Sequence, residues 1–238
     1  MQPHHFWQTL SPPHSNDISE GAVFGEAYPA VLPDGRQLLL PIRVLPGDGQ
    51  SAVASLIVNQ ASFEVEDALS DAMSEIAASF DPEVVVGVPT LGLPLANGVA
   101  RRLGHLRMVA LGTSRKFWYE EELSRPMRSI TSPDQQKRIY LDPRMLPVLQ
   151  GRRIVVVDDV VSTGTSIISV LALLADAGVN VVGVVAAMLQ SLRWEKTFSE
   201  SGLASVPPVA GAIASPLFRR TERGWTREDD SQQCSRQS

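Results

Sequence analysis

The chain has 238 residues, of which 44% are hydrophobic and 20% charged, so it is long enough to bury about 70% of its unfolded surface in a full core. Its net charge of −5 argues against a nucleic-acid partner, because phosphate backbones are bound by net basic faces. No apolar run approaches the roughly 20 residues that cross a bilayer, so we expect no membrane partner either.

Cysteine and histidine usage excludes several kinds of catalytic site. The single cysteine, Cys234, lies in a polar stretch, which rules out an internal disulfide and argues against a thiolate mechanism. Of the four histidines only His105 lies outside the first 20 residues, so a Ser-His-Asp triad or a multi-histidine zinc site has almost nothing to be built from. The start of the chain does not read as a secretory signal, and we expect a cytoplasmic protein.

The two ends of the chain differ in composition from its middle. Residues 1–20 are rich in Pro, His, Ser and Asn without periodicity, and residues 219–238 are polar and charged. Such segments bury too little apolar surface to order themselves. We therefore expect one folded domain over residues 21–218 between a mobile leader and a mobile tail.

The first folded piece reads as a small β appendage over about residues 21–65. Pro33-Asp34-Gly35 predicts a turn between two apolar runs, and Pro46 to Gly49 predicts the end of the second run. A helix follows over residues 64–80. Its apolar residues recur at helical spacing and predict a face that packs on a sheet: Leu69, Met73, Ile76 and Phe80.

From residue 84 the pattern alternates as in a βαβ protein. The apolar runs lack polar alternation, which is typical of strands covered on both faces in a parallel sheet. The predicted strands cover residues 84–88, 107–112, 154–157 and 179–189, and the predicted helices cover residues 94–104 and 165–178. We predict an α/β fold with a doubly wound, mostly parallel sheet. Ligands of such folds bind beyond the carboxyl ends of the strands, where the loops Pro89–Pro94 and Asp158–Ser166 fall.

A long segment between Gly112 and about Leu149 is charged, aromatic and proline-bearing. Only Arg138 to Leu141 suggest a strand within it. Loops of this length inside compact domains are usually functional lids or disordered. We predict a flexible lid over about residues 113–137, with a disordered loop as the alternative.

The stretch VVVDDVVSTGTS, Val155 to Ser166, joins two carboxylates to a hydroxyl-and-glycine loop at a helix start. The free backbone N–H groups and hydroxyls of this loop predict a phosphate site. Asp158 and Asp159 accept hydrogen bonds when ionised, so they suit vicinal hydroxyls or a magnesium ion that bridges substrate oxygens. The pattern indicates a ribose 5-phosphate. In the alternative, one aspartate caps the helix and the other is solvated.

Ile154 to Ser166 resembles the phosphoribosyl-diphosphate signature of type I phosphoribosyltransferases. That family transfers ribose 5-phosphate between diphosphate and a nitrogenous base, with magnesium. The resemblance implies that phosphoribosyl diphosphate binds the two aspartates and the loop after them: Asp158, Asp159, Ser162, Thr163, Gly164, Thr165 and Ser166. It also implies Mg2+ near Asp158 and Asp159, held mainly through substrate oxygens.

Further segments agree with the family in order and spacing, so the resemblance spans about residues 55–190. Arg115 and Lys116 match the pair that opens the flexible catalytic loop of adenine- and xanthine-type members, which implies a catalytic role toward diphosphate. The diphosphate loop of the family is matched by Thr90, Leu91 and Gly92. Gly92 permits close approach of the backbone there.

Base recognition rests on weaker matches, in the β appendage that corresponds to the hood of the family. Asn59 to Phe63, NQASF, resembles the hood segment of xanthine-type members, which implies that Asn59 and Phe63 face the base. Trp194 follows the last long strand, where a base could stack; packing or a subunit contact is the alternative for each aromatic. Ser162 stands where hypoxanthine-guanine members carry an acid, which disfavours that subclass.

Three functions remain open. The first is a phosphoribosyltransferase for a purine of adenine or xanthine type, which forms the homodimer common in the family. The second is a non-catalytic regulator that binds phosphoribosyl diphosphate; the retained pair Arg115 and Lys116 and the missing basic face count against it. The third is an orotate-type or other pyrimidine enzyme, which the purine-like hood and lid disfavour.

Overall fold

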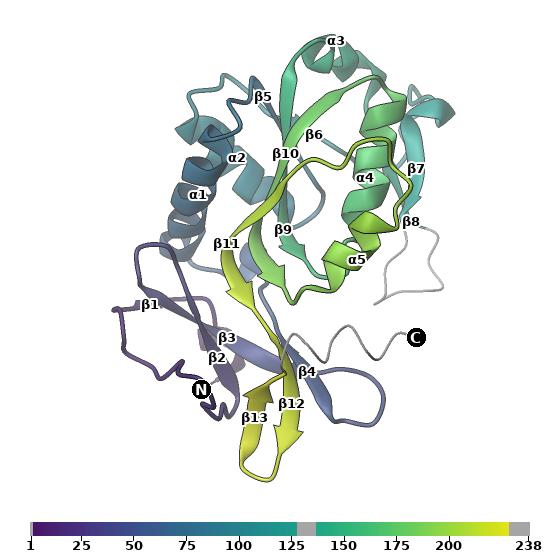
Figure 1. Ribbon diagram of the computed structural model, residues 1–238. Helices are drawn as coiled ribbons and strands as arrows, with labels where there is room; N and C mark the ends of the chain where they lie inside the picture. The colour runs from purple at the N-terminus through teal and green to yellow at the C-terminus, as the bar shows by residue number, and fades with distance from the viewer. Residues whose placement is uncertain (1, 128–136, 229–238) are drawn as a thin grey trace.

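A five-stranded parallel sheet forms the centre of the fold in the computed structural model, which describes residues 2–127 and 137–228 (Figure 1). Its spatial order is β11-β10-β9-β5-β6, and every neighbouring pair runs parallel. The strands are β5 (Val84–Gly87), β6 (Val109–Ala110), β9 (Arg153–Val161), β10 (Asn180–Gln190) and β11 (Val209–Ser215). The apolar runs that predicted this parallel arrangement belong to β5, β6, β9 and β10, whereas β11 was not predicted.

Helices cover both faces of the parallel sheet (Figure 1). On one face lie α1 (Phe63–Ala78) and α2 (Gly92–Arg102), and on the other lie α4 (Thr165–Asp176) and α5 (Arg193–Ser199). Alternate residues of β9 divide between the two cores: Val155 and Val157 belong to one, Ile154 and Val156 to the other. The predicted α/β fold with a doubly wound sheet is confirmed. We call the sheet and these helices the body.

The helix α1 forms as its apolar spacing predicted. Its N-cap is Ser62, whose Oγ accepts a hydrogen bond from the Val65 N–H at 3.3 Å. Leu69 and Met73 are fully buried, and Ile76 packs against the same core. The predicted amphipathic face is therefore the face that covers the sheet.

The β appendage is a six-stranded antiparallel sheet, which we call the hood, below the carboxyl ends of the parallel strands in Figure 1. Its order is β1-β3-β4-β12-β13, with β2 on β3. The strands are β1 (Leu10–Ser11), β2 (Ala27–Val31), β3 (Gln37–Val44), β4 (Ser51–Ala54), β12 (Leu217–Thr221) and β13 (Gly224–Arg227). The predicted turn at Gly35, where φ is +86°, joins β2 to β3. Two strands come from the far end of the chain, which the predicted boundary of 21–65 did not include.

Both predicted mobile ends contain ordered segments. Phe6 and Trp7 are buried in the core, and the Trp7 Nε1–H donates to the Ser55 carbonyl at 2.9 Å. These two aromatics attach a leader whose remaining composition gave no sign of packing. Residues 219–227 belong largely to the hairpin of β12 and β13. Residues 229–238 of the predicted tail, with Cys234, lie outside the described residues.

The segment predicted as a lid contains a strand that the sequence did not indicate. β7 (Ser124–Met127) pairs antiparallel with β8 (Lys137–Tyr140), of which only β8 was predicted. Arg125 and Pro126 interrupt the apolar pattern by which a strand is recognised. Residues 128–136 of the predicted lid lie outside the described residues.

The remaining elements are short. They are the helix α3 (Leu146–Leu149) and 3-10 turns at Pro3–His5, Val58–Gln60, Glu121–Leu123 and Pro143–Met145. Over the part of the chain that the structure describes, no helix combines the length and the apolar character needed to span a bilayer.

We predict that Trp7→Ala lowers the free energy of unfolding by about 3 kcal/mol, because it removes a buried ring and leaves the Ser55 carbonyl without its donor. Urea unfolding followed by circular dichroism measures the change. His5→Ala alters an exposed residue of the same segment and is the matched control. An unchanged unfolding midpoint for Trp7→Ala would show that the leader is detached from the domain.

Candidate functional site

The strand β9 continues through both aspartates. β10 stays paired with β9 from Asp158, which lies opposite Ala186, to Val161, which lies opposite Leu189. The prediction that Asp158–Ser166 is a loop is therefore corrected: the turn before α4 consists of residues 162–164 only. The partner strand supplies hydrogen bonds to the backbone past the point where apolar residues end, which the local sequence does not reveal.

The two predicted loops meet at the carboxyl edge of the sheet. The turn between β5 and α2, which contains a cis peptide bond between Pro89 and Thr90, brings Gly92 against β9. A Cβ added to Gly92 would lie 2.9 Å from both the Cα and the Oδ1 of Asp158. Only a residue without a side chain permits this approach. Gly92 therefore joins the predicted diphosphate turn to the acid pair.

The two aspartates are held together without a cationic partner. Asp158 is buried at 6% exposure, Asp159 is partly buried, and the Asp159 N–H donates to Asp158 Oδ1 at 2.9 Å. Neither forms an ion pair with Lys or Arg in the part of the chain that is described. Burial raises the pKa of Asp158 well above its usual range, and the charge of Asp159 adds to the effect. Burial also raises the pKa of Asp159.

The start of α4 is open toward the same edge. Gly164, at φ +81°, is the N-cap of α4, and no side chain caps this end, so the alternative in which an aspartate caps the helix is wrong. The first N–H groups of α4 are therefore available to an anion. Thr163 Oγ1 and Thr165 Oγ1 lie 3.0 Å apart and share a hydrogen bond.

A cavity of about 500 Å³ lies between this edge and the hood. It joins several of the predicted donor-site residues, namely Leu91, Asp159, Ser162, Thr163, Gly164, Thr165 and Ser166. The hood contributes residues of β3 and β4 and those just after them: Arg43, Leu45, Val53, Ala54, Ser55 and Leu56. Its size is that of a small-molecule site.

A chain of hydrogen bonds crosses the wall of the cavity from hood to body. Gln190 Nε2 donates to the Ala54 carbonyl at 2.7 Å. Because a carbonyl only accepts, the Gln190 Oε1 must face Ser162, whose hydroxyl donates to it at 2.7 Å. Arg193 Nη2 then donates to Ser162 Oγ at 3.0 Å. The Ser162 hydroxyl thus donates its proton to Gln190 within the protein. The sequence had predicted that this hydroxyl donates to the ligand.

Sequence reasoning missed Arg43, Gln190 and Arg193, all of which line the cavity. For Gln190 and Arg193 the sequence does contain a signal. Gln190 is a polar residue at the end of the long apolar strand β10, and Arg193 follows it at the same edge of the sheet. Arg43 gave no such signal, because its strand belongs to the hood.

The predicted base-binding residues do not line the cavity. Asn59 is exposed on a 3-10 turn, and the Phe63 side chain is 82% exposed. Trp194 packs edge-on against Phe198, with ring centroids 5.6 Å apart, and its Cβ lies next to Gly164. Trp194 therefore packs against the protein core, which was the alternative to stacking on a base.

The predicted catalytic pair, Arg115 and Lys116, lies in the segment after β6. Both side chains are exposed, and neither lines the cavity. Arg115 Nη1 lies 3.4 Å from Glu121 Oε2, in a surface ion pair of two mostly exposed side chains. Because exposed pairs contribute little, this contact does not hold Arg115 in place.

Residues 56–200 match the family model of the phosphoribosyl transferase domain. The chain is 30% identical over 140 residues to adenine phosphoribosyltransferase of Mycolicibacterium smegmatis, covering 58% of this chain and 73% of the relative. It is 28% identical over 123 residues to orotate phosphoribosyltransferase of Staphylococcus haemolyticus, covering 48% and 59%. A third relative, amidophosphoribosyltransferase 3, chloroplastic, of Arabidopsis thaliana, is 28% identical; 54% of this chain spans 23% of its length.

Solved structures share the fold at low sequence identity. Adenine phosphoribosyltransferase of Rhodothermus marinus superposes with a TM-score of 0.54 at 20% identity, covering 73% of this chain and 93% of that one. The Saccharomyces cerevisiae enzyme, in complex with an imino-altritol bisphosphate and adenine, gives 0.55 at 16% identity with the same coverage. These likenesses concern the fold alone.

We predict that Asp158→Asn raises the free energy of unfolding at pH 7 by about 1 kcal/mol or more. Between the usual aspartate pKa and the raised native one, the folded protein holds a proton that the unfolded chain has lost, so stability falls as pH rises. The asparagine removes this loss, and its gain shrinks toward pH 4. Urea titrations at both pH values measure it.

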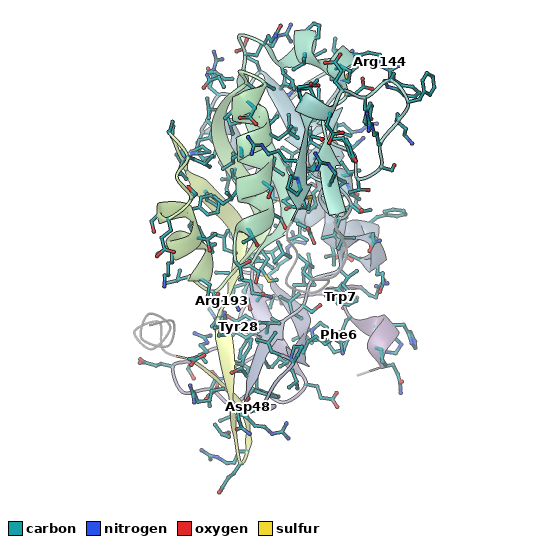
Figure 2. All side chains as sticks on the ribbon, turned by 90° about the vertical axis from the view of Figure 1, so that its right-hand side faces the viewer. Phe6, Trp7, Tyr28, Asp48, Arg144 and Arg193 are labelled. Carbon is teal, nitrogen blue, oxygen red and sulfur yellow. The ribbon has the colours of Figure 1, made fainter. Side chains whose placement is uncertain are left out.

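Asp48→Asn is the control, because Asp48 is an exposed aspartate of the hood (Figure 2). Its variant should leave the unfolding midpoint unchanged at both pH values. An equal gain for Asp158→Asn at pH 4 and pH 7 would contradict the ionisation argument.

Proposed function

This chain belongs to the phosphoribosyltransferase family, and we propose that it transfers ribose 5-phosphate from phosphoribosyl diphosphate to a purine of adenine or xanthine type, releasing diphosphate. One observation carries the proposal. Asp159 and the uncapped start of α4 line one cavity together with Leu91, and Asp158 lies buried between Asp159 and the turn that contains Gly92. Acceptors and donors for a single sugar phosphate are thus arranged side by side.

The acid pair and the helix start suit opposite ends of the sugar. Asp159 lines the cavity beside Thr163 to Ser166. Ionised carboxylates accept from the 2- and 3-hydroxyls, whereas backbone N–H groups and threonine hydroxyls donate to the 5-phosphate. A ligand with hydroxyls at one end and a phosphate at the other therefore matches both groups.

The diphosphate is assigned to the turn after β5 and to two cations beyond β6. Thr90, Leu91 and Gly92 offer backbone N–H groups next to Asp158, and the turn itself has no Lys or Arg. Arg115 and Lys116 follow the strand that pairs with β5 and could supply the missing charge.

The donor set fits a magnesium ion held mainly through the substrate. Asp158 and Asp159 provide hard oxygen ligands, and burial raises the pKa of both carboxyl groups. In the described ranges no three acidic, histidine or cysteine residues gather to form a complete site, so substrate oxygens and water would complete the coordination. Bound magnesium would offset charge on the diphosphate.

Catalysis by this site would be positional and electrostatic. Breaking the bond to diphosphate builds positive character on the sugar carbon and negative charge on the leaving oxygens. Asp158 and Asp159 orient the ring through its hydroxyls, and the start of α4 fixes the 5-phosphate. No protein nucleophile is required in such a displacement.

The purine assignment is supported by adenine phosphoribosyltransferase relatives at 30% identity, which this chain spans over more than 70% of their length. The test is turnover of labelled phosphoribosyl diphosphate with adenine, xanthine, hypoxanthine and orotate, followed by diphosphate release. Tight binding of the donor without turnover of any base would identify a non-catalytic regulator instead. Turnover of orotate alone would identify a pyrimidine enzyme.

We predict that Asp158→Asn combined with Asp159→Asn weakens phosphoribosyl-diphosphate binding by more than about 100-fold, because two charged hydrogen-bond acceptors are lost. Calorimetry measures the affinity, and far-UV circular dichroism checks that the fold survives. Unchanged affinity in the folded double variant would refute the assignment of this site.

We predict that Arg115→Ala combined with Lys116→Ala lowers kcat by about 100-fold or more, because two charges that stabilise the departing diphosphate are lost. Steady-state assays measure it. Arg152→Ala removes another exposed positive charge and should keep full activity. Retained kcat in the double variant would exclude both residues from the reaction.

A further inference from the structure

Arg193 presents unused donors to the cavity. Its Nε–H donates to Ser191 Oγ at 3.1 Å and its Nη2 to Ser162 Oγ at 3.0 Å. A guanidinium carries five N–H donors, so three have no acceptor among the described residues. The side chain lies where the body meets the hood (Figure 2) and lines the cavity.

Local structure fixes the direction of this side chain. Arg193 is the first residue of α5, directly after the sharp backbone bend at Ser191, where φ is +61°. The Ser191 N–H donates to the Ser215 carbonyl at 2.7 Å, which attaches the bend to the end of β11. Ser162 is oriented in turn by Gln190. The guanidinium is therefore held in place before any ligand arrives.

The charge of Arg193 is not matched by a carboxylate at contact distance within the described ranges. Burial lowers the pKa of Arg193, and the more distant charge of Glu228 partly opposes this effect. Glu228 itself pairs with Arg219 at 2.7 Å. A partly buried cation at a cavity wall is costly to desolvate unless an anion or a strong acceptor binds it. Among the described residues no such group reaches Arg193, and we expect the ligand to supply it.

Sheet order places Arg193 on the flank where the acceptor base should enter. β5, which carries the diphosphate turn, lies on one side of β9, and β10, which leads to Arg193, lies on the other. Asp158 and Asp159 on β9 lie between them. Because the incoming base and the leaving diphosphate occupy opposite sides of the sugar carbon in a displacement, the β10 flank is the base side.

We propose that Arg193, positioned by Ser162 and Gln190, selects an acceptor base that presents a carbonyl or anionic oxygen and disfavours adenine. This inference rests on the proposed function. A guanidinium only donates, so the exocyclic amino group of adenine would place a donor against a donor. A 6-oxopurine or a pyrimidine carboxylate offers the required acceptor.

The test compares Arg193→Gln with the unmodified chain. We expect kcat/KM for the preferred oxo-base to fall about 10- to 100-fold, the loss of a charged hydrogen bond, while the Kd for phosphoribosyl diphosphate stays within about twofold. Lys196→Gln removes a charge from the exposed side of the same helix and should change neither quantity. Arg193→Lys keeps the charge but not the forked donor geometry of the guanidinium, so its kcat/KM should lie between those of the unmodified chain and Arg193→Gln.

Binding of product nucleotides keeps the test independent of turnover. Inosine, xanthosine, adenosine and orotidine 5′-monophosphates are titrated into the unmodified chain and Arg193→Gln. The inference is supported if an oxo-base nucleotide binds more tightly than adenosine monophosphate and Arg193→Gln abolishes this difference. Comparison of the purine nucleotides with orotidine monophosphate then shows whether the oxygen belongs to a 6-oxopurine or to a pyrimidine carboxylate. If that pattern appears without turnover of any base, the proposed function fails and the inference stands.

Two results would overturn the inference. One is a preference of the unmodified chain for adenine or adenosine monophosphate that Arg193→Gln does not alter. The other is an equal loss of affinity for phosphoribosyl diphosphate and for the base in Arg193→Gln, which would assign the guanidinium to the donor substrate.

Discussion

The site depends on two adjacent carboxyl groups near the end of β9, one buried and one partly buried, that have no cationic partner among the described residues. Asp158 lies within the sheet because β10 continues the ladder past it, and Gly92 leaves room for the neighbouring turn to touch it. Ionisation of both carboxyl groups in the unliganded protein would therefore place uncompensated charge at the point where its loops meet. That cost is offset only when hydroxyls, or a cation held by the substrate, reach the pair.

The second organising contact joins the two parts of the molecule. Gln190 ends a strand of the body, yet its amide is oriented by the carbonyl of Ala54 in the hood. The direction of every later hydrogen bond in the wall follows from this one, since the Ser162 hydroxyl can then only donate to Gln190 and accept from Arg193. The hood thereby sets the polarity of the cavity wall, in addition to closing it.

The sequence predicted the elements whose signals are local. Apolar runs gave four strands of the parallel sheet, helical spacing gave α1, and the stretch from Val155 to Ser166 gave the acids and the anion turn. What it could not give depends on distant segments. The extension of β9 to Val161 requires β10, the hood requires strands from the far end of the chain, and the leader is attached by two buried aromatics and by the pairing of β1 with β3.

The same division explains why the donor substrate can be inferred from the sequence more firmly than the acceptor. The donor groups lie within a few residues of strand ends, so motif spacing fixes their positions. The base side instead depends on Arg193 and Gln190 meeting Ser162, and on a contact that spans 136 residues to Ala54. The family match covers residues 56–200 and leaves out the hood strands, of which β3 and β4 line the cavity. Under the proposed function, base specificity depends on packing between hood and body. There Trp194, which looks suited to stacking, packs against Phe198, and Gln190 at the end of a strand orients Ser162.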